Sequence, residues 1–411
     1  MDERITSTLK SGTNHFDAGR VTRMREVMKR HVDSGAVPGL VMLVHHRGRE
    51  HADAIGTMGY DTKEPIQRNT IFRLASMTKP ITAVGALILI EECKVRLDDP
   101  VDEWLPELKG RRVLRTIDSP LDDTVPAKRP ITPRDLMTFR SGYGEVEFIS
   151  PNCPLVKAMM EAQLPLFAFP FAHSSEDFMR RLGNLPLAFQ PGERWLYHMS
   201  CDILGVLIAR VSGKSLGAFL RERLFEPLGM NDTGFYVPEA KLERLPICHG
   251  ADMVTGKLVV LDEARGGWAS RPPTFEGGAG GLVSTVDDMV AFGRMMLNSG
   301  TYRDQRILSR FSIEAMTTDQ LPTEQKAVSP FFENFWDNHG WGFGVGVITK
   351  RNELAAVPGR FGWDGAFGSS WWVDPKEEMI GVLMVQRRPD VLGMPSTVRD
   401  FWTSAYQLID D

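Results

Sequence analysis

Strand-forming runs lie near both ends of this 411-residue chain, and a long, mainly helical stretch separates them. Gly39–His46 is a β-rich run near the N-terminus, and residues 369–373 and 379–386 are two more near the C-terminus. An apolar sheet face must be buried against another layer. We therefore predict an α/β (α+β) fold in which both ends share one antiparallel sheet, flanked by N- and C-terminal helices. The expected division is a discontinuous sheet lobe at residues 1–80 and 270–411, and a mainly helical lobe with lid-like loops at 81–269.

Composition narrows the class of protein. The chain carries 48 Lys and Arg against 53 Asp and Glu, and 42% of its residues are hydrophobic. This balance argues against dominant disorder and against a nucleic-acid binder that works through a basic surface. No stretch approaches the roughly 20 apolar residues of a membrane helix. The first 20 residues also lack the apolar core of a signal peptide. We expect a cytoplasmic protein with neither a membrane nor a nucleic-acid partner.

Metal and redox motifs are missing from the sequence. The four cysteines form no C-x-x-C pair, and the nine histidines form no H-x-x-x-H or H-E-x-x-H pattern. Such spacings are typical of zinc sites and redox dithiols. We therefore expect no metal and no cofactor.

The tetrapeptide Ser-Met-Thr-Lys, from Ser76 to Lys79, is the first candidate for chemistry. It directly precedes residues 81–90, which are apolar on nearly every helical face and predict a buried helix. A spacing of three places the serine and the lysine on the same face. The helix N-terminus favours developing negative charge at Ser76, and burial lowers a lysine pKa enough for Lys79 to accept a proton.

Two further segments could complete such a site. Tyr197 could hydrogen-bond both Ser76 and Lys79 and carry a proton to a leaving group. The glycine-bounded segment at residues 361–366 would let a carbonyl approach the backbone, where an N–H could join that of Ser76 in an oxyanion hole. A core tyrosine and a simple β-turn are the alternatives for these two segments.

Together, in this order, the three segments resemble the serine β-lactamase and penicillin-binding-protein superfamily. The closer similarity is to its esterase branch, the family VIII carboxylesterases, which look like class C β-lactamases. The resemblance implies a two-lobed β-lactamase-like fold with the site in the cleft between the lobes. It also implies that Ser76 is the nucleophile, Lys79 the general base and Tyr197 a partner in acid–base transfer, with oxyanion-hole N–H groups from Ser76 and Ala366. Supporting stretches span nearly the whole chain: residues 72–79, 97–101, 131–137, 141–142, 278–285 and 373–375.

The sequence departs from the lactamase pattern at two motifs. Trp363-Asp364-Gly365 stands where lactamases have K-T-G, so the lysine that would bind a substrate carboxylate is lost. Met199 stands where the Tyr-x-Asn motif has its amide. Both changes favour neutral esters. We expect these four residues and His198 to contact substrate, with packing behind the site as the alternative for His198; the role of Asp364 is open.

The resulting hypothesis is a serine carboxylesterase that hydrolyses small neutral carboxylic esters through an acyl-enzyme. A β-lactamase or D-amino-acid peptidase, an acyltransferase (transesterase) and a catalytically silent binding protein for a β-lactam or cell-wall fragment remain as alternatives. The sequence leaves open whether Lys79 or Tyr197 takes the first proton, and it leaves the oligomeric state open.

Two other segments need an interpretation. Residues 213–217 match the G-x-S-x-G pattern of α/β-hydrolases, but a helix precedes Ser215 where that motif needs a strand, so we expect a helix N-cap.

Residues 145–175 are irregular and proline-rich, and the apolar run at 164–172 could form a lid or a packed loop.

Overall fold

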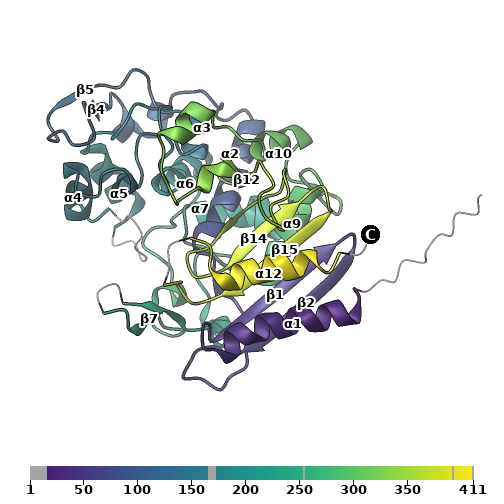
Figure 1. Cartoon of the computed structure of the whole chain (residues 1–411). Coiled ribbons are helices and arrows are strands. Elements are labelled where there is room, and N and C mark those ends of the chain that lie inside the picture. The colour runs from purple at the N-terminus through teal and green to yellow at the C-terminus, as the bar shows by residue number, and fades with distance from the viewer. Residues whose placement is uncertain (1–15, 165–172, 253–254, 391–392, 410–411) are drawn as a thin grey trace, which may run out of the picture.

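The computed structural model describes residues 16–164, 173–252, 255–390 and 393–409. Within these residues, a seven-stranded sheet has the strand order β11-β12-β13-β14-β15-β1-β2, and every neighbouring pair is antiparallel. The N-terminal hairpin β1–β2 therefore pairs with the C-terminal strand β15, as Figure 1 shows by colour. The predicted fold class is confirmed. The seven strands are β1 (Gly39–His46), β2 (Arg49–Gly56), β11 (His339–Trp341), β12 (Gly346–Ile348), β13 (Phe361–Asp364), β14 (Ser370–Asp374) and β15 (Met379–Val385).

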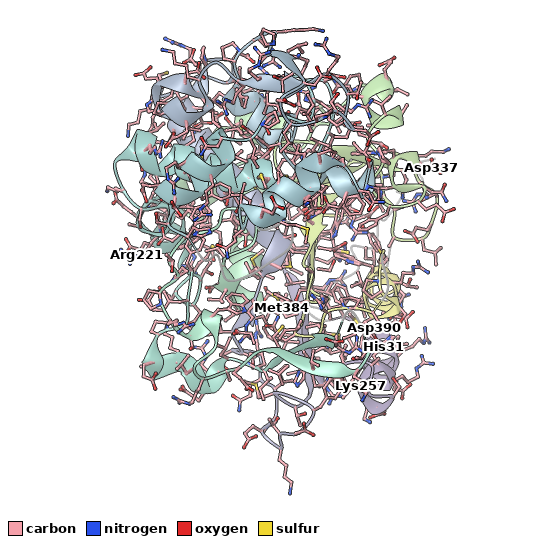
Figure 2. All side chains as sticks on the ribbon, turned by 90° about the vertical axis from the view of Figure 1, so that its left-hand side faces the viewer. His31, Arg221, Lys257, Asp337, Met384 and Asp390 are labelled. Carbon is pink, nitrogen blue, oxygen red and sulfur yellow. The ribbon has the colours of Figure 1, made fainter. Side chains whose placement is uncertain are left out.

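Helices cover both faces of this sheet. α1 (Ala18–Asp33) and α12 (Ser396–Tyr406) pack on one face, and α9 (Val286–Leu297) packs on the other. Because the sheet lies between two layers, all eight residues of β1 are buried. Met384 on β15 is fully buried, whereas Lys257 and Arg221 lie at the periphery (Figure 2).

The middle of the chain is mainly helical and packs beside the sheet (Figure 1). Its centre is α2, in which every residue from Thr78 to Leu89 is buried, and α2 packs against α6. The apolar run therefore forms the buried helix that its sequence predicts. The described helices of this part are α2 (Thr78–Glu91), α3 (Pro133–Met137), α4 (Pro154–Glu161), α5 (Ser175–Gly183), α6 (Met199–Ser212), α7 (Leu216–Leu220) and α8 (Glu226–Leu228). Two more helices, α10 (Arg310–Met316) and α11 (Thr323–Ala327), follow α9.

Within the part of the chain that the structure describes, four short strand pairs lie outside the seven-stranded sheet. The pair that matters for the site is β3 with β8, because β3 leads directly into the turn before α2. The four pairs are β3 (Phe72–Arg73) with β8 (Val283–Ser284), β4 (Arg112–Leu114) with β5 (Thr124–Pro126), β6 (Cys248–Ala251) with β7 (Leu258–Asp262), and β9 (Thr301–Tyr302) with β10 (Gln305–Arg306).

The backbone departs from regular secondary structure at two places. The helix α7 ends at Leu220 and continues as a π-helical turn over Arg221–Phe225. Pro227 follows this turn, and its missing N–H cannot close the regular hydrogen bond one turn earlier. The strand β12 covers only Gly346–Ile348, because Gly344 just before it has a left-handed φ of 68°.

The expected lid falls only partly within the described residues. Residues 165–172, most of its apolar run, lie outside them. The lobe boundaries at 80 and 270 stay a prediction. No single described helix is long and apolar enough to span a membrane; α6 and residues Leu216–Leu228 reach that length only as a pair bent by 75°.

Candidate active site

Ser76 lies on a short 3₁₀ turn, Ala75–Met77, that joins β3 to α2. Ala75 adopts a φ of 46°, an uncommon conformation for a residue with a side chain, and it turns the backbone sharply before the helix. Leu282, the residue before β8, fixes the turn, because its carbonyl accepts the Leu74 N–H at 2.8 Å and its N–H donates to Thr78 Oγ1 at 3.2 Å. The serine therefore stands at a rigid helix N-terminus and remains 8% exposed.

Lys79 lies one helical turn further along and is fully buried. Its Nζ is 2.8 Å from Ser76 Oγ, 2.8 Å from the Ala279 carbonyl oxygen and 3.2 Å from His198 Nδ1. Burial lowers the pKa of Lys79 to about 8, although the nearby Asp202 opposes the shift. An amine with this pKa is partly neutral near physiological pH and can accept the hydroxyl proton of Ser76.

Tyr197 approaches the same two residues from the other side. The Lys79 ammonium lies 4.5 Å from the centre of the tyrosine ring, and Trp363 Nε1–H donates to the Tyr197 hydroxyl at 2.6 Å. Burial raises the pKa of Tyr197, while hydrogen bonds with Ser76 and Trp363 partly offset that rise. The structure thus brings Ser76, Lys79, Tyr197 and Trp363 together, with the tyrosine hydroxyl protonated.

The turn after β13 lies against the turn that carries Ser76. A methyl group at Gly365 would come within 2.5 Å of the Leu74 carbonyl oxygen, so only glycine allows this approach. Ala366 follows it and is exposed. In the described residues, the Ala366 backbone N–H donates no hydrogen bond, which leaves it available to a substrate oxygen.

Asp364 does not face this site, which corrects the expectation that it contacts substrate. Successive side chains on a strand point to opposite faces, so Trp363 points toward Tyr197 and Asp364 points away. Asp364 Oδ1 accepts hydrogen bonds from Ser370 Oγ and from Trp372 Nε1, and Trp402 of α12 donates to the same Ser370 oxygen at 2.9 Å. This carboxylate ties β13 to β14 beneath α12.

His198 and Met199 begin α6. His198 adopts a φ of 74°, and this backbone turn directs its imidazole to Lys79. Burial and the neighbouring Lys79 charge lower the pKa of His198 well below its usual value, so the ring is neutral. Met199 is buried and packs in the main core.

Two acidic residues that the sequence interpretation missed lie behind Lys79. Asp202 on α6 is buried and accepts the Ala279 N–H at 2.9 Å; burial raises its pKa to about 7. Glu145 is buried too, and neither of its oxygens has a hydrogen-bond partner within the described ranges. Burial raises its pKa well above the usual value. The sequence signal that could have found Asp202 is its place as a single acid in the apolar sequence of α6. A fully buried Asp is rare without a partner, so such a residue points to a buried polar site.

Glycine also sets the position of Ala279. A methyl group at Gly278 would lie 2.5 Å from the Cys201 carbonyl oxygen, so the chain can pass close to α6 only with glycine here. The Ala279 carbonyl then reaches Lys79, and its N–H reaches Asp202.

Aromatic side chains surround Tyr197 and Trp363. The half-buried rings of Phe331 and Phe335 lie 4.8 Å from the Tyr197 ring and 6.0 Å from the Trp363 ring, respectively. Phe148 contacts Phe331 at 5.3 Å. An apolar surface of this kind is typical of a pocket for an acyl chain or an uncharged alcohol.

Ser215, the serine of the G-x-S-x-G match, caps a helix in the structure. Ser215 is the N-cap of α7, where its Oγ accepts the Ala218 N–H at 3.2 Å, as its sequence context predicts. As for metals, the described part of the chain holds no group of three His, Cys, Asp or Glu side chains that could bind an ion.

Comparison with known proteins identifies the family. The β-lactamase family model matches residues 24–397. Esterase EstB of Burkholderia gladioli is 27% identical over 398 residues, which cover 93% of this chain and 94% of the esterase. Acyltransferase calJ of Penicillium decumbens is 28% identical over 381 residues, with 86% of each chain covered.

The fold agrees with a solved structure. EstCE1, described as a hydrolase with promiscuous acyltransferase activity, superposes with a TM-score of 0.77 at 23% identity, covering 94% of this chain and 98% of its own. The overall architecture is therefore that of the β-lactamase fold. The chain belongs to the β-lactamase family and is a hydrolase or acyl-transferring enzyme similar to esterases and acyltransferases.

Proposed function

We propose that this protein is a serine carboxylesterase of the family VIII type that hydrolyses small neutral esters. The observation that carries the proposal is the 2.8 Å contact between Lys79 Nζ and Ser76 Oγ, made by a buried lysine whose pKa is lowered to about 8. A serine hydroxyl becomes a nucleophile only when a nearby base can take its proton. Lys79 has both the position and the basicity for that role.

In the acylation step, Ser76 Oγ attacks the ester carbonyl carbon, and its proton moves to Lys79. The carbonyl electrons move to oxygen, where the backbone N–H groups of Ser76 and Ala366 stabilise the negative charge. When the tetrahedral intermediate collapses, the bond to the alcohol oxygen breaks. Tyr197 shares hydrogen bonds with Ser76 and can pass the proton on to that alcohol.

Deacylation repeats the same steps with water. Water attacks the acyl carbon and gives its proton to Lys79; as the acyl–oxygen bond breaks, that proton returns to the released Ser76 oxygen. The two products are a carboxylic acid and an alcohol, and no external electron or cofactor is needed.

The side chain of Trp363 favours neutral substrates. An indole carries no charge, and its N–H already donates to the Tyr197 hydroxyl, so Trp363 offers a substrate carboxylate neither a counter-charge nor a free donor. Phe331 and Phe335 add apolar surface beside it. A difference in hydrophobic contacts changes the preference between two substrates by modest factors. A polar or charged substrate group that finds no partner in the site has a larger effect. We therefore expect p-nitrophenyl butyrate to be a much better substrate than nitrocefin.

Steady-state hydrolysis of p-nitrophenyl butyrate tests the proposal. We expect Ser76→Ala to lower kcat by about 10³-fold or more, a typical loss for a nucleophile. Ser215→Ala is the matched control, because it removes another serine hydroxyl at a helix N-terminus, and its kcat should stay within about threefold. Undiminished turnover by Ser76→Ala would overturn the assignment.

Acyl transfer to an alcohol is a second candidate, favoured by the similarity to acyltransferase calJ and by the half-buried phenylalanines around Tyr197. An acyl-enzyme in an apolar pocket can react with a bound alcohol in place of water. Adding 1-butanol to the butyrate assay and quantifying butyl butyrate separates the two: ester formation in excess of hydrolysis favours the transferase. A fluorophosphonate probe separates both from a silent binding protein, which it would not label.

A further inference from the structure

The hydrogen-bond partners of Lys79 Nζ constrain how the lysine works as a base. A charged ammonium donates three hydrogen bonds, whereas a neutral amine donates two and has one lone pair. The Ala279 carbonyl oxygen, 2.8 Å away, can only accept. If His198 Nδ1 at 3.2 Å also accepts, the two amine hydrogens are committed, and the lone pair must point to Ser76 Oγ.

The protonation state of His198 decides whether Nδ1 can accept. Its Nε2 lies 3.5 Å from Asp202 Oδ2, a partner that favours a proton on Nε2 and leaves a lone pair on Nδ1. Asp202 Oδ1 meanwhile accepts the Ala279 N–H at 2.9 Å. One buried carboxylate therefore holds both acceptors of the lysine, the imidazole and the peptide group.

The other ionisable groups around the imidazole are compatible with this tautomer. Glu145 Oε1 lies 4.0 Å from His198 Nδ1, and Cys201 lies on the first turn of α6 next to Asp202. Burial raises the pKa values of both Glu145 and Cys201, which keeps them neutral and removes the charge that would draw a second proton onto the ring.

We propose that His198, held by Asp202, is a positioning residue that directs the lone pair of Lys79 to the hydroxyl of Ser76. The inference rests on the proposed function, because it assigns a role in the same acylation step. The sequence did not indicate this role for His198. The lactamase motif places an amide at the next position, which is Met199 here, and His198 reaches the lysine through its left-handed backbone conformation.

Two substitutions at His198 separate positioning from packing. His198→Asn places an amide oxygen near the Nδ1 position, and His198→Gly removes the acceptor; both residues tolerate the φ of 74°. We expect His198→Gly to lower kcat for p-nitrophenyl butyrate about 100-fold, with KM within about threefold, since a misplaced catalytic group costs a factor of this size. His198→Asn should recover kcat to within about tenfold of wild type.

The chain offers a matched control. His31 on α1 also contacts an aspartate, with its Nε2 2.8 Å from Asp400 Oδ2, and it lies at the edge of the molecule (Figure 2). His31→Asn should leave kcat and KM unchanged. Thermal unfolding of each variant shows whether it is folded.

The outcomes distinguish this inference from the proposed function. Equal losses in His198→Asn and His198→Gly, or wild-type kcat in His198→Gly, would overturn the positioning role. Retained activity in Ser76→Ala would instead overturn the proposed function. If the glycine variant does not fold, Asp202→Asn serves: it preserves volume and an acceptor for Ala279, but its amide favours the tautomer with a proton on Nδ1. At a pH above the Lys79 titration, where the lysine is neutral in both proteins, we expect at least a tenfold lower kcat with unchanged KM, roughly the loss for one misplaced hydrogen bond; an unchanged kcat there would overturn the inference.

Discussion

Two buried cations flank Ser76, and their surroundings differ in kind. Arg73, three residues before the serine, is fully buried and fully paired. Its guanidinium donates to Asp262 at 2.6 Å, to Gln386 Oε1 at 3.0 Å, and to the carbonyl oxygens of Pro246 and Glu263. A buried charge with a complete set of partners holds the segments that contain those partners in place.

Lys79, three residues after the serine, is equally buried but less completely neutralised. Within the described residues, no carboxylate oxygen forms an ion pair with its Nζ; Glu145 and Asp202 lie nearby, and the Asp202 charge raises its pKa. Both acids are themselves buried, and burial raises their pKa values. A group of mutually shifted acids and bases is typical of a site that moves protons. The contrast indicates that Arg73 stabilises the fold around Ser76, whereas Lys79 is set for catalysis.

The largest expected effect separates the two cations by activity. Lys79→Met should lower kcat for p-nitrophenyl butyrate by about 10³-fold or more, because no general base remains. It should leave the unfolding temperature unchanged or higher, since it removes a buried charge that has no ion-pair partner. Kinetics and thermal unfolding of the same preparation measure both. A variant that is inactive only because it is unfolded would contradict the contrast.

The next effect concerns stability. Arg73→Met leaves Asp262 buried without its ion pair and should lower the free energy of unfolding by about 3–5 kcal/mol. Arg68→Met is the control: Arg68 also pairs with an aspartate, Asp287, but both side chains are about half exposed, so the expected loss is under about 1 kcal/mol. Denaturant titration measures both. Similar losses for the two variants would show that burial does not distinguish them.

A smaller effect appears in the pH profile. If catalysis needs neutral Lys79, kcat/KM rises with pH as the lysine loses its proton near a pKa of about 8. The Asp202 carboxylate stabilises the charged amine, so Asp202→Asn should move this rise to lower pH. Because the two groups titrate together, the measured midpoint belongs to the pair. A rise displaced to higher pH would contradict the assigned electrostatics.

The smallest effect is on the pH dependence of stability. The folded-state pKa of Glu145 is raised above its ordinary value of 4.5, so above that pH the folded chain retains a proton that the unfolded chain has lost. Stability therefore falls as pH rises from 4.5 to the folded-state pKa. Glu145→Gln removes this penalty and should gain about 1 kcal/mol, more at pH 8 than at pH 5. Unfolding temperatures at the two pH values test this, and a gain confined to pH 5 would refute it.

Local sequence patterns predict the parts of the structure that neighbouring residues determine. The buried α2 and the N-cap at Ser215 follow from apolar periodicity and from capping chemistry. The resemblance to a known family predicted which residues would converge on Ser76, and the structure places Lys79, Tyr197 and Trp363 there.

The features of the site that local patterns do not predict depend on long-range packing. Asp364 was expected at the site because it belongs to the same tripeptide as Trp363, but strand alternation turns it to the opposite face. Glu145, Asp202 and Ala279 come from segments up to 134 residues apart in sequence, 279 − 145, and only the folded chain shows that they meet at Lys79.

The acyl-enzyme is the central claim, and intact-mass spectrometry tests it most directly. The wild-type protein, quenched in acid within a turnover of p-nitrophenyl butyrate, should gain the mass of one butyryl group, and peptide mapping should locate it on Ser76. Ser76→Ala should remain unmodified, while Ser215→Ala should label like wild type. Hydrolysis without a covalent adduct, or an adduct on another residue, would contradict the account.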